Sequence, residues 1–164
     1  TLAGSSAASD VYKRQNYTSG TRAYRNDTYS VTGFGTNTLS TLETGIGNGS
    51  NNCASQPWTC KFTSAFGDNA LYTTSGSRET TAIGASALYG LITGTYNTAV
   101  GAKAGYSLDN NIYYNTMIGA LAGYNLTDGN DNTLIGSEVA YNGSNASDNT
   151  IVGQKAGYLS LIHI

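Results

Sequence analysis

The chain has 164 residues, of which 11% are charged, and its formal net charge is −2. This acidic balance argues against a nucleic-acid partner, because nucleic-acid-binding proteins carry a basic face. No apolar run approaches the roughly 20 residues that a membrane span needs. Gly, Thr, Ser and Asn fill 77 positions (21, 22, 17 and 17), which disfavours helices. We therefore predict a β-rich chain with no nucleic-acid partner and no membrane insertion in this segment.

Both ends of the chain resemble translated sequencing adapters. Residues 10–15 read DVYKRQ, and the reverse complement of a codon sequence for them translates as LSLIHI, which is residues 159–164. This inverted pair is similar to the transposase end used in tagmentation libraries, and residues 5–9 (SSAAS) fit the adapter upstream of it. We expect residues 1–15 and 159–164 to be adapter-derived tails. Residues 16–158 would then be a fragment of a longer protein.

Residues 16–62 are expected to form irregular N-terminal coils with a disulfide loop. Gly35, in TGFGTNTL, and the Ile46-Gly47 pair look like degenerate repeat units that lack a tyrosine in register. Cys53 and Cys60 enclose the single Pro and the single Trp of the chain. We predict that a disulfide closes this loop, which implies an oxidising, extracytoplasmic location. The alternative is half of a metal site, but such sites need four ligands.

A short internal repeat organises residues 63–158, and each unit carries one glycine. These glycines are Gly67, Gly84, Gly101, Gly119, Gly136 and Gly153, and their spacing is constant except for one extra residue between Gly101 and Gly119. Five positions after each of them stands a tyrosine: Tyr72, Tyr89, Tyr106, Tyr124, Tyr141 and Tyr158. Three positions before them stand Ser64 and then Thr81, Thr98, Thr116, Thr133 and Thr150. One position before each glycine stands a Phe, Ile or Val, and three positions after it an Ala or Val.

The period, about 17 residues, is too short for a helical-hairpin repeat and suits one turn of a parallel β-solenoid, so we predict an all-β fold. A narrow bore favours small inward residues, which fits the Ala column, and the glycine fits a bend. Asn97, Asn115, Asn132 and Asn149 precede the last four threonines and are expected to stack amide on amide along the axis. Because Thr shares a strand face with the apolar residue two positions on, we expect the Thr column to point inward or to line an edge.

Few residues indicate chemistry. His163, the single histidine, lies in an adapter-like tail, so a nucleophilic triad or a catalytic zinc site lacks its usual parts. Asp128 and Asp131 are the closest carboxylate pair along the chain, but their turn lacks the GGxGxD spacing of calcium-binding rolls. We expect no enzyme and no catalytic, cofactor-binding or metal-ligating residue. N-glycosylation sequons, which are candidate sites if the source is eukaryotic, occur at Asn16, Asn26, Asn48, Asn125, Asn142 and Asn145.

Two columns allow more than one interpretation. The tyrosines suit a stacked ladder or a subunit interface, and alternatively a sugar-binding aromatic surface. A rank of threonines at about 4.8 Å spacing is also what ice-binding solenoids use. Those solenoids usually have two parallel Thr columns, whereas this chain has one.

The units N-T-x-[IV]-G-x-x-A-G-Y resemble the head repeats of trimeric autotransporter adhesins and the shaft repeats of phage and virus tail fibres. The resemblance covers about Thr63 to Tyr158. It implies a left-handed β-roll, association of three chains through their solenoid faces, and an extracellular, cell-surface or virion location with a surface glycan or receptor as partner. The expected function is a non-enzymatic structural or adhesive fibre segment. The alternatives are an ice-binding solenoid and a carbohydrate-binding fibre domain.

Overall fold

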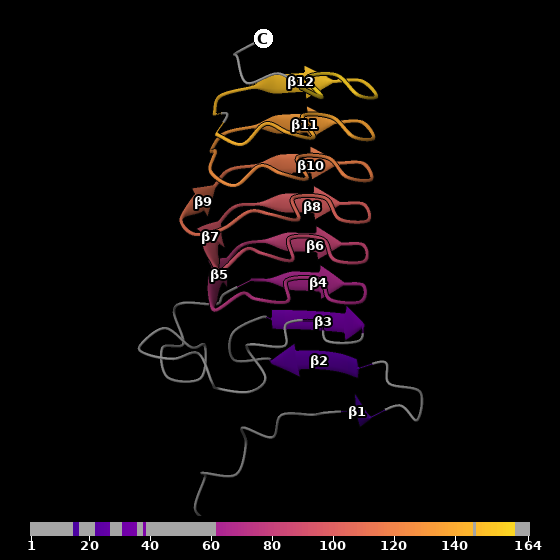
Figure 1. Cartoon of the computed structure of the whole chain (residues 1–164). Helices are drawn as coiled ribbons and strands as arrows, with labels where there is room; N and C mark the ends of the chain where they lie inside the picture. Colours follow the sequence, from indigo (N-terminus) through magenta and orange to yellow (C-terminus); the bar gives the residue numbers. More distant parts are fainter. Residues whose placement is uncertain are drawn as a thin grey trace, which may run out of the picture.

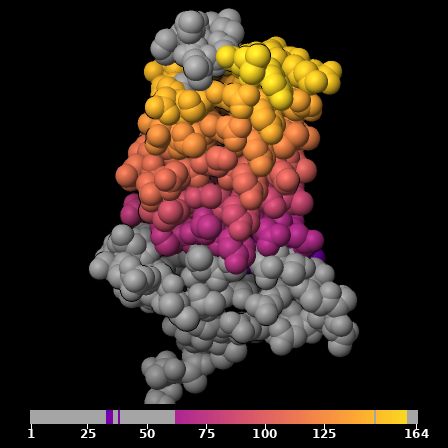
Figure 2. Space-filling view, viewed as in Figure 1, coloured from indigo at the N-terminus to yellow at the C-terminus, as the bar shows by residue number. Residues whose placement is uncertain are grey.

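The computed structural model describes residues 15–16, 22–26, 31–35, 38, 62–145 and 147–159. Their regular structure consists of short strands, most of which belong to coils of about 17 residues stacked on one another (Figure 1). Figure 2 shows consecutive coils as bands that lie across a rod, from magenta to yellow along the sequence. The predicted all-β parallel solenoid is therefore confirmed.

Each regular coil contributes one strand to a long sheet. The nine strands of this sheet lie in the order β1 (Gln15–Asn16), β2 (Arg22–Asn26), β3 (Val31–Gly35), β4 (Ser64–Phe66), β6 (Thr81–Ile83), β8 (Thr98–Val100), β10 (Thr116–Ile118), β11 (Thr133–Ile135) and β12 (Thr150–Val152). A second, three-stranded sheet contains β5 (Gly76–Arg78), β7 (Thr93–Thr95) and β9 (Ile112–Tyr113). From β3 onward every strand pair is parallel, and equivalent positions of successive units face each other, as Thr98 faces Thr116.

The N-terminal strands only partly follow the solenoid. Strand β3 pairs in register with β4, and the hydroxyl of Thr38 donates a hydrogen bond of 2.7 Å to the Gly67 carbonyl. Gly35 therefore belongs to a coil, as its sequence context predicted. Strand β2 pairs in the antiparallel direction with both β1 and β3. Outside the described residues lie Ile46-Gly47, the predicted Cys53–Cys60 disulfide loop and the adapter-like tails apart from Gln15 and Leu159.

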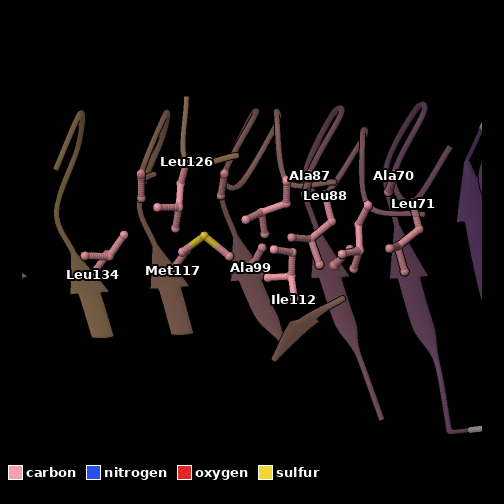
Figure 3. Packing of buried hydrophobic residues seen from close by; sticks show 14 of the residues in the cluster. Ala70, Leu71, Ala87, Leu88, Ala99, Ile112, Met117, Leu126 and Leu134 are labelled. Carbon is pink, nitrogen blue, oxygen red and sulfur yellow. The ribbon is translucent and has the colours of Figure 1, made fainter. Parts of the chain in front are cut away.

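Alternation along each strand turns its middle residue into the core. These middle residues are Ala65, Ala82, Ala99, Met117 and Leu134, all buried, and the half-buried Ile151. They pack against the column that follows the glycine by three positions, which holds the buried Ala70, Ala87, Ala104, Ala122 and Val139 (Figure 3). The prediction that the Ala column points into a narrow bore is confirmed.

Two core columns exchange volume from coil to coil. Where the middle strand residue is the small Ala82, the residue four positions after the glycine is the large Leu88. Where the middle residue is the large Met117, its counterpart is Gly123. A Cβ on Gly123 would lie 3.1 Å from both the Met117 sulfur and a Leu134 methyl carbon. In the coil between them both positions are small, Ala99 and Gly105, and a Cβ on Gly105 would lie 2.8 Å from Leu88 and 2.9 Å from Met117 of the neighbouring coils. Large side chains of one coil therefore fill the space that small residues leave in the next, as close packing of a core requires.

The repeat glycine is required by the distance between coils. Gly84 has a φ of 134°, which side-chain-bearing residues rarely adopt. A Cβ placed on it would lie 2.5 Å from the carbonyl oxygen of Gly101 in the next coil. Any larger residue would push two coils apart, which explains a glycine in every unit.

A ladder of asparagine amides runs through the interior. The Oδ1 atom of Asn115 accepts hydrogen bonds from the backbone N–H (3.1 Å) and the Nδ2 group (2.9 Å) of Asn132 in the next coil. Asn132 is bound in the same way by Asn149, and Asn97 by Asn115. The predicted stacking of amides along the axis is confirmed. In the described residues no buried side-chain nitrogen or oxygen lacks a hydrogen-bond partner.

Candidate functional site

The outer side of the long sheet carries a Thr column and an aliphatic column, and we call it the Thr/Ile face. The first column consists of Ser64, Thr81, Thr98, Thr116, Thr133 and Thr150, and the second of Phe66, Ile83, Val100, Ile118, Ile135 and Val152. Apart from the half-buried Val100, the second column is exposed, from 38% at Ile135 to 64% at Val152. Neither column contains a charged residue. The structure thus presents an uncharged, partly apolar strip along the rod.

The expectation that the threonines point inward or line an edge is wrong. The Thr and aliphatic residues do share one strand face, but that face is the outer one, because the middle strand residue and the asparagine occupy the interior. Thr98, Thr116 and Thr133 are half-buried and Thr150 is exposed. A row of aliphatic side chains is therefore open to contact with another surface.

The six repeat tyrosines form one continuous stack. Neighbouring ring centroids are 4.9 to 5.1 Å apart, and the ring planes differ by 2° to 13°. The predicted ladder is thus present, and both faces of each inner ring are covered by its neighbours. Sugars pack their C–H groups against the free face of an aromatic ring, whose electron-rich π surface attracts them. The stack offers them only ring edges between its ends, which favours a structural role over a sugar-binding one.

Two lysines and a carboxylate surround the stack. The Nζ atom of Lys103 lies 5.8 Å from the ring centroid of Tyr106, within the range of a cation–π interaction. Lys155 lies 5.9 Å from the ring of Tyr158 and 3.8 Å from the Glu138 carboxylate. Burial, with smaller contributions from the neighbouring tyrosines, raises the pKa of Tyr141 above its ordinary value of 10.0. The fold therefore favours the protonated form of Tyr141, and the two lysines lie against the rings of Tyr106 and Tyr158.

A second tyrosine stack, which sequence reasoning missed, lies five positions before the glycines. The rings of Tyr96 and Tyr114 are 5.0 Å apart with planes that differ by 12°, and they are 46% and 56% exposed. A hydrogen bond with Glu79 is the main cause that raises the pKa of Tyr96. The sequence does contain a signal for this stack: two successive units carry tyrosine at a position where the later units carry Asp131 and Asp148.

The sequons differ in accessibility. Nδ2 of Asn125 donates a hydrogen bond of 2.7 Å to Oδ1 of Asn142, and both side chains are half-buried. Asn145 is exposed and is therefore the most accessible of these three. The remaining sequons are Asn16 and Asn26, of which only the backbone is described, and Asn48, which lies outside the described residues.

The carboxylates are spread along the rod. Asp128 and Asp131 are both exposed. Across the described ranges, no three His, Cys, Asp or Glu side chains gather where they could hold a metal ion. The same part of the chain contains no helix with the length and apolar character needed to cross a bilayer.

A scan against protein-family models gives no match, and searches among curated proteins and among solved structures give no significant match either. What the structure supports is therefore a β-solenoid of about five turns, with an asparagine ladder and a tyrosine stack. Any function has to be argued from these surfaces.

Proposed function

We propose that the chain is a non-enzymatic structural and adhesive segment of an extracellular or virion fibre, in which three copies associate along their Thr/Ile faces. The observation that carries the proposal is the exposed aliphatic column of that face. Contiguous exposed apolar residues on a soluble protein mark interaction surfaces. The column repeats with every coil, so two parallel rods can match each other along their whole length.

The absence of charge on the face also supports association. In a stack of coils, a charge repeated in one column would lie about 4.8 Å from its copies and repel them. Neutral Thr and aliphatic side chains avoid this repulsion within one rod and between rods. The uncharged Thr/Ile face is therefore compatible both with the stacking of coils and with contact between copies of the chain.

The size of the face sets the expected strength of association. A three-residue strand is about 10 Å long and neighbouring strands are about 4.8 Å apart, so the six strands from β4 to β12 in this sheet offer roughly 300 Å² of sheet face. A stable interface buries about 800 Å² per partner. We therefore expect the flanking loops to contribute, and we expect association of this segment to depend strongly on concentration.

Sedimentation velocity over a wide concentration range tests the proposal. We expect a trimer at high protein concentration and its loss in Ile118→Asp, which places a charge on the face. Ala120→Asp is the matched control, because the equivalent position of the first unit carries Asp68 naturally. A chain that stays monomeric at every concentration would contradict association through this face.

A second candidate function, ice binding, is favoured by the outward orientation of the Thr column. Thr98, Thr116 and Thr133 lie in register on parallel strands, and a regular array of hydroxyl and methyl groups at about 4.8 Å spacing suits an ordered water lattice. This function requires a free face, and so a monomer in solution. Thermal hysteresis and inhibition of ice recrystallisation that are lost in Thr116→Asp would support it.

A further inference from the structure

One corner of the rod departs from the repeat. Five positions before the glycines the chain carries Phe62, Glu79, Tyr96, Tyr114, Asp131 and Asp148, all of them exposed. The columns that hold the stack together carry nearly the same residue in each coil. This column varies, so the stacking of coils does not dictate which side chain stands in it.

The backbone of this column makes the two tyrosines unexpected. Tyr96 and Tyr114 have φ values of 61° and 58°, in the left-handed region that favours Gly, Asn and Asp. Asp131 and Asp148 have the same conformation and fit it better. About half of each tyrosine ring is exposed, so burial does not explain the choice. The left-handed conformation recurs in this column in every described coil, so it belongs to the fold. What is particular to Tyr96 and Tyr114 is a pair of large rings stacked on each other and exposed.

A local insertion coincides with these tyrosines. The interval from Gly101 to Gly119 is one residue longer than every other glycine interval of the repeat. Its extra residue lies between Leu108 and Ile112, because Ile112 pairs with Gly94 of the preceding coil. The next residue, Tyr113, is a third exposed tyrosine, whose backbone N–H donates a hydrogen bond of 2.7 Å to Oδ1 of Asn130. The irregular unit therefore carries two exposed tyrosines, Tyr113 and Tyr114, and the ring of Tyr114 stacks on Tyr96 of the preceding coil.

Carboxylates flank the aromatic rings along the rod. Glu79 interacts with Tyr96 from the coil on one side. On the other side the backbone N–H of Asp131 donates a hydrogen bond to the Tyr113 carbonyl, which fixes Asp131 in the adjoining coil. Asp148 follows in the coil after that. The corner therefore combines exposed aromatic rings with negative charge.

Among the described residues, Arg78 in β5 is a cation that borders the corner, because it precedes Glu79 and its backbone lies in register with Thr95. The lysines Lys103 and Lys155 lie in loops that follow β8 and β12, at the opposite end of these strands from the second sheet (Figure 1). A positively charged group would therefore be attracted to the corner rather than to the lysine-bearing loops.

We infer that the corner formed by Glu79, Tyr96, Tyr113, Tyr114 and Asp131 is a docking site for an arginine-bearing segment of a partner protein. A guanidinium group stacks on aromatic rings and donates paired hydrogen bonds to carboxylates, and this site offers both. Lysine forms a point charge and lacks the planar stacking surface. The docking site is separate from the Thr/Ile face and does not depend on association of copies.

Titration with a short peptide of alternating arginine and glycine, followed by calorimetry or NMR, tests the inference. We expect saturable binding that is several-fold tighter than that of the lysine counterpart. The double variant Tyr96→Asn/Tyr114→Asn removes both rings, and asparagine readily adopts the left-handed conformation of these positions. It should weaken binding about fivefold or more. Asp131→Asn should weaken it about threefold. Asp68→Asn, which removes an exposed carboxylate beyond β4, should leave binding unchanged.

The outcomes that would overturn the inference are distinct. Equal affinity for the arginine and lysine peptides, or an equal loss in Asp68→Asn, would indicate attraction to net charge alone. Saturable binding of a neutral oligosaccharide in place of the peptide, lost in the tyrosine double variant, would assign the corner to a glycan. Circular dichroism melting of each variant verifies that the coils remain folded.

Discussion

Two tyrosine stacks run along the rod at nearly the same spacing. Neighbouring rings in the six-membered stack are 4.9 to 5.1 Å apart, and Tyr96 and Tyr114 are 5.0 Å apart. The first stack recurs in every unit and is half-buried. The second occupies two units only, is exposed, and lies on backbone in the left-handed region. The contrast teaches that repetition marks what the coils need for stacking, whereas a departure from it marks a side chain chosen for another reason.

The largest expected effect concerns a residue that the stack needs in every coil. In Gly119→Ala the new Cβ would overlap the Gly136 carbonyl, in addition to the strain of a φ of 134°. We expect a loss of more than about 3 kcal/mol in unfolding free energy, measured by chemical denaturation. Gly153→Ala is the matched control, because its φ is 129° but its Cβ would meet only Ala156, at 3.6 Å. An equal loss in both variants would show that the carbonyl contact contributes nothing.

The next largest loss of unfolding free energy is expected for a substitution in the asparagine ladder. Asn115→Ala removes the acceptor for Asn132 and the donor to the carbonyls of Tyr113 and Gly129, and it leaves buried polar groups unpaired. We expect it to cost about 3 kcal/mol by the same measurement. Asn115→Thr should cost less, because Thr80 fills this position in an earlier unit and bonds to a nearby carbonyl. An unchanged unfolding free energy in Asn115→Ala would show that the ladder does not stabilise the rod.

The two tyrosine stacks themselves are expected to respond differently. Tyr106→Ala removes two stacking contacts of a half-buried ring and should cost about 2 kcal/mol of unfolding free energy. Tyr114→Asn removes one contact but relieves the left-handed strain, so its stability should stay within about 1 kcal/mol of the parent. Thermal and chemical denaturation compare the variants directly. A larger loss in Tyr114→Asn would give the exposed pair a structural role.

Alkaline pH should produce the smallest of these effects and act on the half-buried stack. The pKa of Tyr141 is raised in the folded chain, so the fold favours the protonated ring. Its stabilising contribution is complete below the ordinary tyrosine pKa of about 10 and is lost as pH rises through the folded value. Tyrosinate absorbance recorded together with circular dichroism measures this loss. Tyr141→Phe, which cannot ionise, should lose less stability at high pH.

Much of this architecture could be predicted from the repeat. The repeat period, the glycine spacing and the inward Ala column follow from the sequence, because a repeated column has a repeated environment in a stack. The amide ladder from Asn97 to Asn149 and the tyrosine stack follow for the same reason. Repetition does not reveal which way a face points. Thr116 and Ile118 share a strand face by parity, but parity alone leaves open whether that face is the inner or the outer one.

Features that vary from coil to coil were beyond sequence reasoning. The exchange of volume between Met117 and Gly123 needs the knowledge that the two columns meet across the core. The left-handed backbone of Tyr96 and Tyr114 has no residue signature, since Glu79 and Asp131 share the conformation. The antiparallel strand β2 precedes the repeat and has none of its columns. In each case a three-dimensional contact, and not a local preference, decides the structure.

The parallel ladders that join the coils also determine how the rod would bear tension. The hydrogen bonds of the parallel strand pairs and of the asparagine ladder join each coil to the next along the rod. A pull on the two ends therefore loads these bonds in series, and the outermost coil opens while the others hold. Each opened coil releases about 17 residues, or roughly 50 Å of extended chain. The rod would thus lengthen in equal steps under force, which single-molecule pulling would record as a regular sawtooth.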